Sequence, residues 1–83
     1  MESNNGHMEF TIGGRKVSLS KKAVENALQH VKPEAIKKYW VRIGSRDYPI
    51  KQAVAAASGV PGIAFISTDA FRILTRLGFE VKA

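Results

Sequence analysis

The sequence contains no cysteine, which excludes disulfide bonds and zinc sites built on thiolates. A chain without cysteine suits the reducing cytoplasm, where we expect this protein to act. Histidine is scarce as well, and neither His7 nor His30 has another histidine at metal-ligand spacing. No apolar run approaches the ~20 residues of a membrane-spanning helix, and the polar N-terminus does not resemble a secretory signal. We therefore expect no metal, no cofactor and no membrane contact.

Groups that could catalyse a reaction are also few. Most acidic residues of the domain stand near a lysine or arginine, and we interpret them as surface or capping residues: Glu9, Glu25, Glu34, Asp47, Asp69 and Glu80. The helix dipole explains His30, which lies near the end of a predicted helix. Gly13-Gly14 is too short for a phosphate-binding loop, and helix capping explains Ser67-Thr68. We predict that the chain is not an enzyme.

The length of the chain, 83 residues, allows one domain. Residues 1–7 are polar and patternless, so we expect them to be an expression scar or a disordered tail, with residues 8–83 forming a single domain. Without Glu2, the thirteen basic and six remaining acidic residues leave a formal charge of +7. Such a charge attracts polyanions such as DNA, RNA or anionic lipid, while simple solubility is the alternative explanation.

The N-terminal part of the domain is predicted to form a hairpin followed by a helix. Apolar residues alternate over residues 9–19, and a four-residue loop at residues 13–16 would pair Ile12 with Val17. Ser20 is placed to cap the helix. Four apolar residues at helical spacing form its expected buried stripe: Val24, Ala27, Leu28 and Val31.

The middle of the chain predicts a second hairpin and a second helix. Pro33 suits the first position of a short helical turn through residues 34–37. Residues 44–46 are the expected hairpin turn, and Tyr48 begins the return strand. Pro49 lacks an N–H group, so this strand should be short or at a sheet edge. A narrow stripe of small apolar residues predicts the helix that follows: Ile50, Ala53, Val54 and Ala57.

The C-terminal part predicts a third helix and a last strand. Ser67 or Thr68 is the expected cap of this helix. Gly78 is placed for a left-handed end, with Phe79 folding back on the helix. Residues 79–81 predict the strand. The order of elements indicates the α+β class: a small single domain with two β-hairpins, three main helices and a short C-terminal strand.

Basic residues are concentrated where they could hold phosphate groups. A helix start disfavours lysine by about 0.3–1 kcal/mol, and an anion bound there would gain exposed N–H groups and a lysine. The predicted nucleic-acid-binding residues are those at helix starts and those between residues 30 and 51, together with one arginine of the third helix: Lys21, Lys22, Lys37, Lys38, Arg42, Arg46, Lys51 and Arg72. Trp40 shares a strand face with Arg42 and is a candidate for base stacking, whereas Tyr39 is assigned to the core.

Three stretches carry a resemblance to a known family: residues 39–53 (YWVRIGSRDYPIKQA), Phe65, and residues 72–81 (RILTRLGFEV). They resemble the N-terminal head domain of McrA-like, modification-dependent HNH endonucleases and related small uncharacterised bacterial proteins. The resemblance implies an accessory, DNA-associated domain with Lys51 at the matched polar position and Arg46 as a weaker match. The nuclease and base-recognition domains of those enzymes are absent from this sequence, so cleavage is not implied.

Together these observations predict a non-catalytic nucleic-acid-binding module. The expected ligand is DNA, held through its phosphates at basic helix starts. The alternative is a protein–protein interaction or homodimerisation module without nucleic-acid affinity. In that case the face of Trp40, or the edge strand containing Pro49, would meet a partner or a second copy.

Overall fold

The computed structural model describes residues 7–83 of the chain, and this part contains three α-helices, a short 3₁₀ helix and five strands. The elements follow one another as β1 (Met8–Ile12), β2 (Arg15–Leu19), α1 (Lys21–Ala27), β3 (Trp40–Ile43), β4 (Arg46–Pro49), α2 (Ile50–Ser58), η1 (Gly62–Ala64), α3 (Ser67–Arg76) and β5 (Val81–Lys82). The predicted α+β class is confirmed. The tail expected at residues 1–7 lies, except for His7, outside the described residues.

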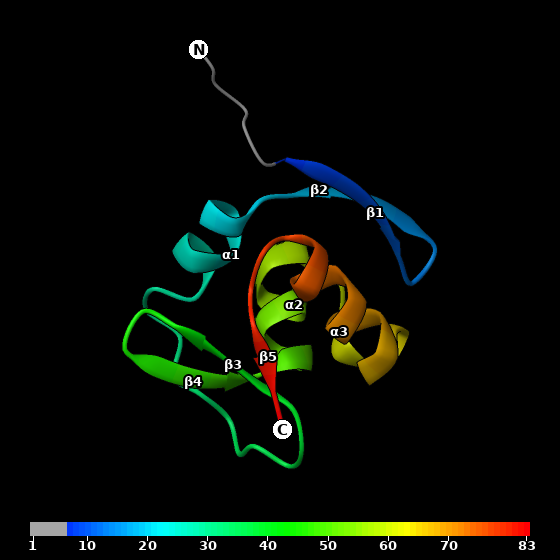
Figure 1. Cartoon of the computed structure of the whole chain (residues 1–83). Helices are drawn as coiled ribbons and strands as arrows, with labels where there is room; N and C mark the ends of the chain where they lie inside the picture. Colours follow the sequence, from blue (N-terminus) through cyan, green and yellow to red (C-terminus); the bar gives the residue numbers. More distant parts are fainter. Residues whose placement is uncertain (1–6) are drawn as a thin grey trace.

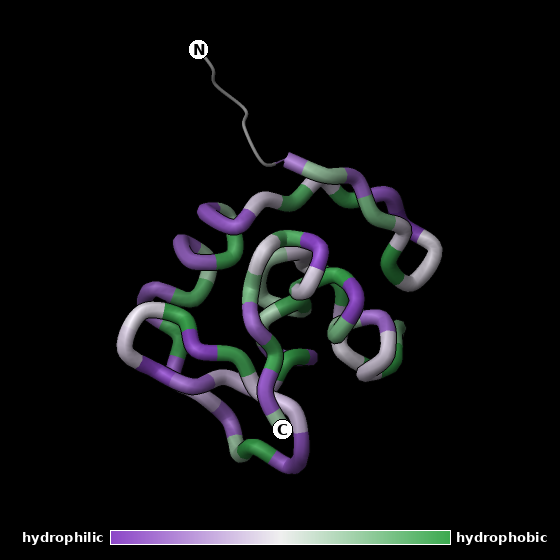
Figure 2. The backbone as a smooth tube through the Cα atoms, in the orientation of Figure 1, coloured by the Kyte–Doolittle hydropathy of each residue, from purple (hydrophilic) through white to green (hydrophobic). Residues whose placement is uncertain are grey.

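The strands form two small antiparallel sheets. One is the β1–β2 hairpin, and the other has the order β4–β3–β5, which places β4 at an edge as Pro49 predicts. Helix α2 lies between them and contacts β2, β3, β4 and both other helices (Figure 1). Its residues Ile50, Ala53 and Val54 are buried in the common core. Hydrophilic and hydrophobic residues alternate along the backbone around this centre (Figure 2).

The turn of the first hairpin is shorter than predicted. Ile12 lies opposite Arg15, not opposite Val17, so the predicted register is wrong by two residues. Gly13 and Gly14 explain the difference, because both have positive φ angles, 57° and 82°. Two such residues close a hairpin without further loop residues. A shift of two residues keeps each side chain on its predicted face of the ribbon.

The ends of the helices show which capping predictions hold. Ser20 caps α1 as predicted, and its hydroxyl accepts a hydrogen bond from the Ala23 N–H at 3.0 Å. Helix α1 ends at Ala27, earlier than the predicted stripe implies, and Val31 lies in the irregular segment beyond it. Gly78 ends α3 with a φ of 101°, which confirms the predicted left-handed residue.

The start of α3 corrects one prediction. Ile66, not Ser67 or Thr68, is the residue before the first turn. The carboxylate of Asp69, in the first turn, accepts a hydrogen bond from the Ile66 N–H at 3.3 Å. Asp69 is therefore the side chain that caps the start of the helix. The hydroxyls of Ser67 and Thr68 are thus left on an exposed surface.

The segment between α1 and β3 corrects another prediction, because residues 34–37 form no helical turn. The Gln52 side chain of α2 instead binds the Glu34 N–H and the Lys32 carbonyl. The second hairpin is also tighter than predicted: β4 begins at Arg46, and the turn consists of Gly44 and Ser45. The last strand begins at Val81 and pairs with β3.

Candidate functional site

The irregular segment of residues 31–39 is held in place by three side chains of β4 and α2: Arg46, Tyr48 and Gln52. The Gln52 side chain bridges it: its Oε1 accepts from the Glu34 N–H, and its Nε2 donates to the Lys32 carbonyl, both at 2.9 Å. The buried Tyr48 hydroxyl lies 2.7 Å from the Val31 carbonyl oxygen. These contacts fix a loop that has no regular structure of its own, and so help to position Lys37 and Lys38 within it.

Beside this segment lies an open groove of about 350 Å³, which we call the lysine groove. Its walls are residues 34–35 and 37–39 of the segment, the start of α2 at residues 49–52, and Ser67 of α3. Three of the eight predicted phosphate-binding residues line it: Lys37, Lys38 and Lys51. The structure therefore brings together lysines that are far apart in the sequence.

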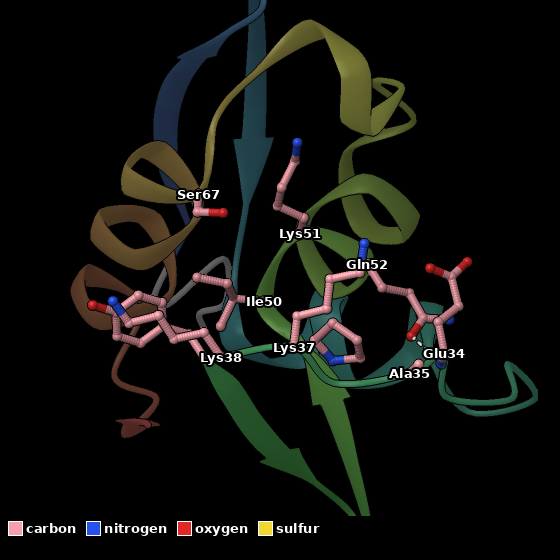
Figure 3. A pocket seen from close by; sticks show the side chains of 10 residues that line it. Glu34, Ala35, Lys37, Lys38, Ile50, Lys51, Gln52 and Ser67 are labelled. Atoms are coloured by element: carbon pink, nitrogen blue, oxygen red, sulfur yellow. Dashed lines mark hydrogen bonds between the residues drawn. The ribbon is translucent and has the colours of Figure 1, made fainter.

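The three lysines serve different parts of the lysine groove (Figure 3). Lys51 extends from the start of α2, with its Nζ 5.6 Å from the centre of the Phe65 ring, and Lys37 reaches from the segment towards α2. Lys38 turns the other way, with its Nζ 5.1 Å from the centre of the Tyr39 ring. Among residues 7–83, neither Lys37 nor Lys51 makes an ion pair. Their charges are therefore not offset by a direct carboxylate partner in the described part of the chain.

The start of α2 adds partial positive charge to the lysine groove. Its N-cap residue is Pro49, which makes no side-chain hydrogen bond to the first turn. The first N–H groups of a helix have no partner within it, and the helix dipole is positive at this end. Glu34 is the one acid among the lining residues, and its carboxylate weakens the positive potential at one end. The groove is nevertheless suited to an anion.

The other predicted phosphate-binding residues are dispersed over the surface, and most of them already contact groups of the protein. Lys21 lies with its Nζ 3.5 Å from the Gly78 carbonyl oxygen and 5.3 Å from the centre of the Phe79 ring. Arg46 donates to the Val31 carbonyl at 3.2 Å. Lys22 is exposed on α1. None of these three lines the lysine groove.

Two arginines are paired with carboxylates. Arg42 Nε lies 2.9 Å from Asp47 Oδ1. The hydrogen bond to this carboxylate, and to a smaller degree the attraction of its charge, raises the pKa of Arg42. Arg72 lies 3.2 Å from Asp69, one helical turn away. Each carboxylate offsets part of the positive charge that an incoming phosphate would meet.

Trp40, the predicted stacking residue, is half-buried on β3, and the Lys82 Nζ lies 5.4 Å from the centre of its ring. The aromatic side chain that lines the lysine groove is instead Tyr39, which is half-buried and packs against the core as predicted. Tyr39 meets Phe71 of α3, a residue that lies off the buried stripe of that helix. An aromatic residue outside the buried stripe is the sequence pattern that could have marked this surface.

No three histidine, aspartate or glutamate side chains within residues 7–83 are grouped so that they could hold a metal ion. No helix in this part of the chain has the length and apolar character required to cross a membrane.

Fold and groove together define a small α+β domain whose lysine-lined concave surface is built from a loop and two helix starts. A family model matches residues 8–83, and the chain belongs to the SCO5918-like family. Comparison with curated proteins and comparison with solved structures each found no match.

Proposed function

We propose that this domain is a non-catalytic module that binds DNA through phosphate groups in the lysine groove. One observation carries the proposal: Lys37 and Lys51 line one open groove at a helix start that has no side-chain cap. A phosphate there would accept hydrogen bonds from α2 and gain two nearby ammonium groups. We place this activity in the cytoplasm, in keeping with the absence of cysteine.

The proposed contact set is smaller than the set predicted from sequence. It consists of Lys37, Lys38 and Lys51, because these lysines share the groove. The remaining basic residues contribute to the net charge of +6, which attracts a polyanion at a distance. The resemblance of residues 39–81 to an endonuclease head domain supports the same proposal, since Lys51 is its matched polar position.

A titration with fluorescently labelled DNA at several salt concentrations tests the proposal. Three phosphate contacts give a slope of log affinity against log salt of about −3 for a duplex and about −2 for a single strand. Binding that does not depend on salt would contradict phosphate contact. If no DNA or RNA binds at low salt and micromolar protein, the proposed function is wrong.

A protein-interaction module is the second candidate, and a different surface favours it. Ile63 in η1 is 97% exposed and Ile66 is 62% exposed, and an isolated domain gains nothing from this placement of apolar side chains. A partner or a second copy would cover both residues. Gel filtration with light scattering separates the candidates, because a dimer that persists in high salt and does not bind DNA supports this one.

A further inference from the structure

A second hollow adjoins the lysine groove, and we call it the aromatic hollow. It is lined by Tyr39, Ser67, Thr68, Phe71 and Arg72, and it encloses about 350 Å³. It shares Tyr39 and Ser67 with the lysine groove. A ligand with a charged part and an apolar part could therefore occupy both cavities at once.

The apolar wall of this hollow is a pair of aromatic rings. The ring centres of Tyr39 and Phe71 lie 5.5 Å apart with an angle of 81° between the planes. In such an edge-to-face arrangement the two rings do not stack on each other, so the pair leaves ring surface for another planar group. Phe71 remains 39% exposed, while its helix buries Ala70, Ile73 and Leu74 instead.

Polar groups stand at the margin of the same hollow. Ser67 and Thr68 present exposed hydroxyls, because Asp69 rather than either of them closes the start of α3. The Arg72 side chain is 62% exposed and is held by Asp69 at 3.2 Å. Hydroxyls and a guanidinium group can hydrogen-bond the edge of a planar heterocycle whose face rests on aromatic rings.

We infer that the aromatic hollow takes an unpaired nucleobase, so that the domain binds single-stranded nucleic acid in preference to duplex. This inference rests on the proposed function, since the attached phosphates would lie in the lysine groove. Both faces of a base inside a duplex are covered by neighbouring base pairs, and only an unpaired or extruded base can stack on a protein ring. Lys38 lines the lysine groove, and its Nζ lies over the ring of Tyr39, a residue that both cavities share.

Fluorescence anisotropy with three probes tests the inference on the whole chain. The probes are an oligothymidine of about twelve nucleotides, an abasic oligomer of equal length that keeps the phosphates, and a duplex of that length. We expect the oligothymidine to bind about tenfold more tightly than the abasic oligomer. Phe71→Ala should remove this difference without changing affinity for the abasic oligomer. Ile36→Ala, which truncates a side chain of similar exposure, 41%, should leave the difference intact.

The outcomes separate the two proposals. Equal binding of oligothymidine and abasic oligomer by the unaltered protein overturns the base site while leaving the phosphate groove, as does tighter binding of duplex than of single strand. If none of the probes binds, the proposed function fails and the base site with it. Circular dichroism reports whether Phe71→Ala is folded. If it is not, Tyr39→Leu replaces it, and the comparison of probes on the unaltered protein decides.

Discussion

Helices α1 and α2 both carry a lysine in the first turn, yet the folded protein uses the two starts differently. At α1 the hydroxyl of Ser20 occupies a first-turn N–H group, and Lys21 is directed to the Gly78 carbonyl beyond the end of α3. At α2 the capping position is Pro49, which makes no such bond, and Lys51 borders the lysine groove. The first start is satisfied within the protein, and the second is open to an external ligand.

The difference shows what a helix start needs before it can serve as an anion site. Both starts have the same dipole direction and carry a lysine in the first turn, so neither property distinguishes them. What distinguishes α2 is its surroundings: the segment 34–39, pinned by Gln52, brings Lys37 and Lys38 to its side. The packing around a helix start therefore decides its role.

Reversing two charges in the lysine groove should have the largest effect on DNA affinity. At about 0.1 M salt each phosphate contact contributes roughly a factor of ten, so the double variant Lys37→Glu, Lys51→Glu should bind DNA ~100-fold more weakly. Its salt slope should also fall by about two. Anisotropy titrations at several salt concentrations measure both quantities.

A control variant separates a local effect from one of net charge. Lys16→Glu, Lys22→Glu changes the charge by the same amount at two exposed residues that do not line the lysine groove. It should reduce affinity far less and leave the slope nearly unchanged. Similar losses in the two double variants would mean that DNA recognises only the overall charge of the domain.

Most of the fold could be predicted from local patterns. Ser20 as a cap and Gly78 as a helix end follow from residue chemistry that acts over a few positions. The failures have other causes. Two successive glycines closed the first hairpin earlier than predicted, and at residues 34–37 the Gln52 side chain binds the Glu34 N–H and the Lys32 carbonyl where a helical turn was expected.

The candidate site was less predictable, because it depends on contacts between distant parts of the chain. Lys51 was identified from its position at a helix start, which is visible in the sequence. The contact of the Lys21 ammonium group with the Gly78 carbonyl oxygen, 57 residues away, is not visible in the sequence. Nor is the meeting of Tyr39 with Phe71, since each residue belongs to a different element and only packing brings their rings together.

A carboxylate at the start of α2 should make that start resemble α1. Pro49→Asp would place an acceptor beside the first N–H groups, at a position whose φ of −58° and ψ of 142° suit a capping aspartate. The new carboxylate would compete with phosphate for the same groups, and we expect DNA affinity to fall about tenfold. Pro49→Ala removes the ring without adding an acceptor and should keep the original affinity. Equal losses in the two variants would show that the proline ring, not the open helix start, matters for binding.

The smallest expected effect concerns α1, where Lys21 contacts the Gly78 carbonyl and the Phe79 ring. Because these contacts are exposed, Lys21→Ala should lower the free energy of unfolding by only about 0.5–1 kcal/mol, as measured by urea denaturation. Lys22→Ala makes the same change in the same helical turn, at an exposed lysine that does not line the lysine groove, and should cost less. Neither variant should change DNA affinity beyond the small effect of removing one positive charge, because the start of α1 is already occupied from within the protein. A loss of DNA binding in Lys21→Ala comparable to that of the groove variant would mean that α1, too, offers its start to the ligand, and the distinction between the two helices would disappear.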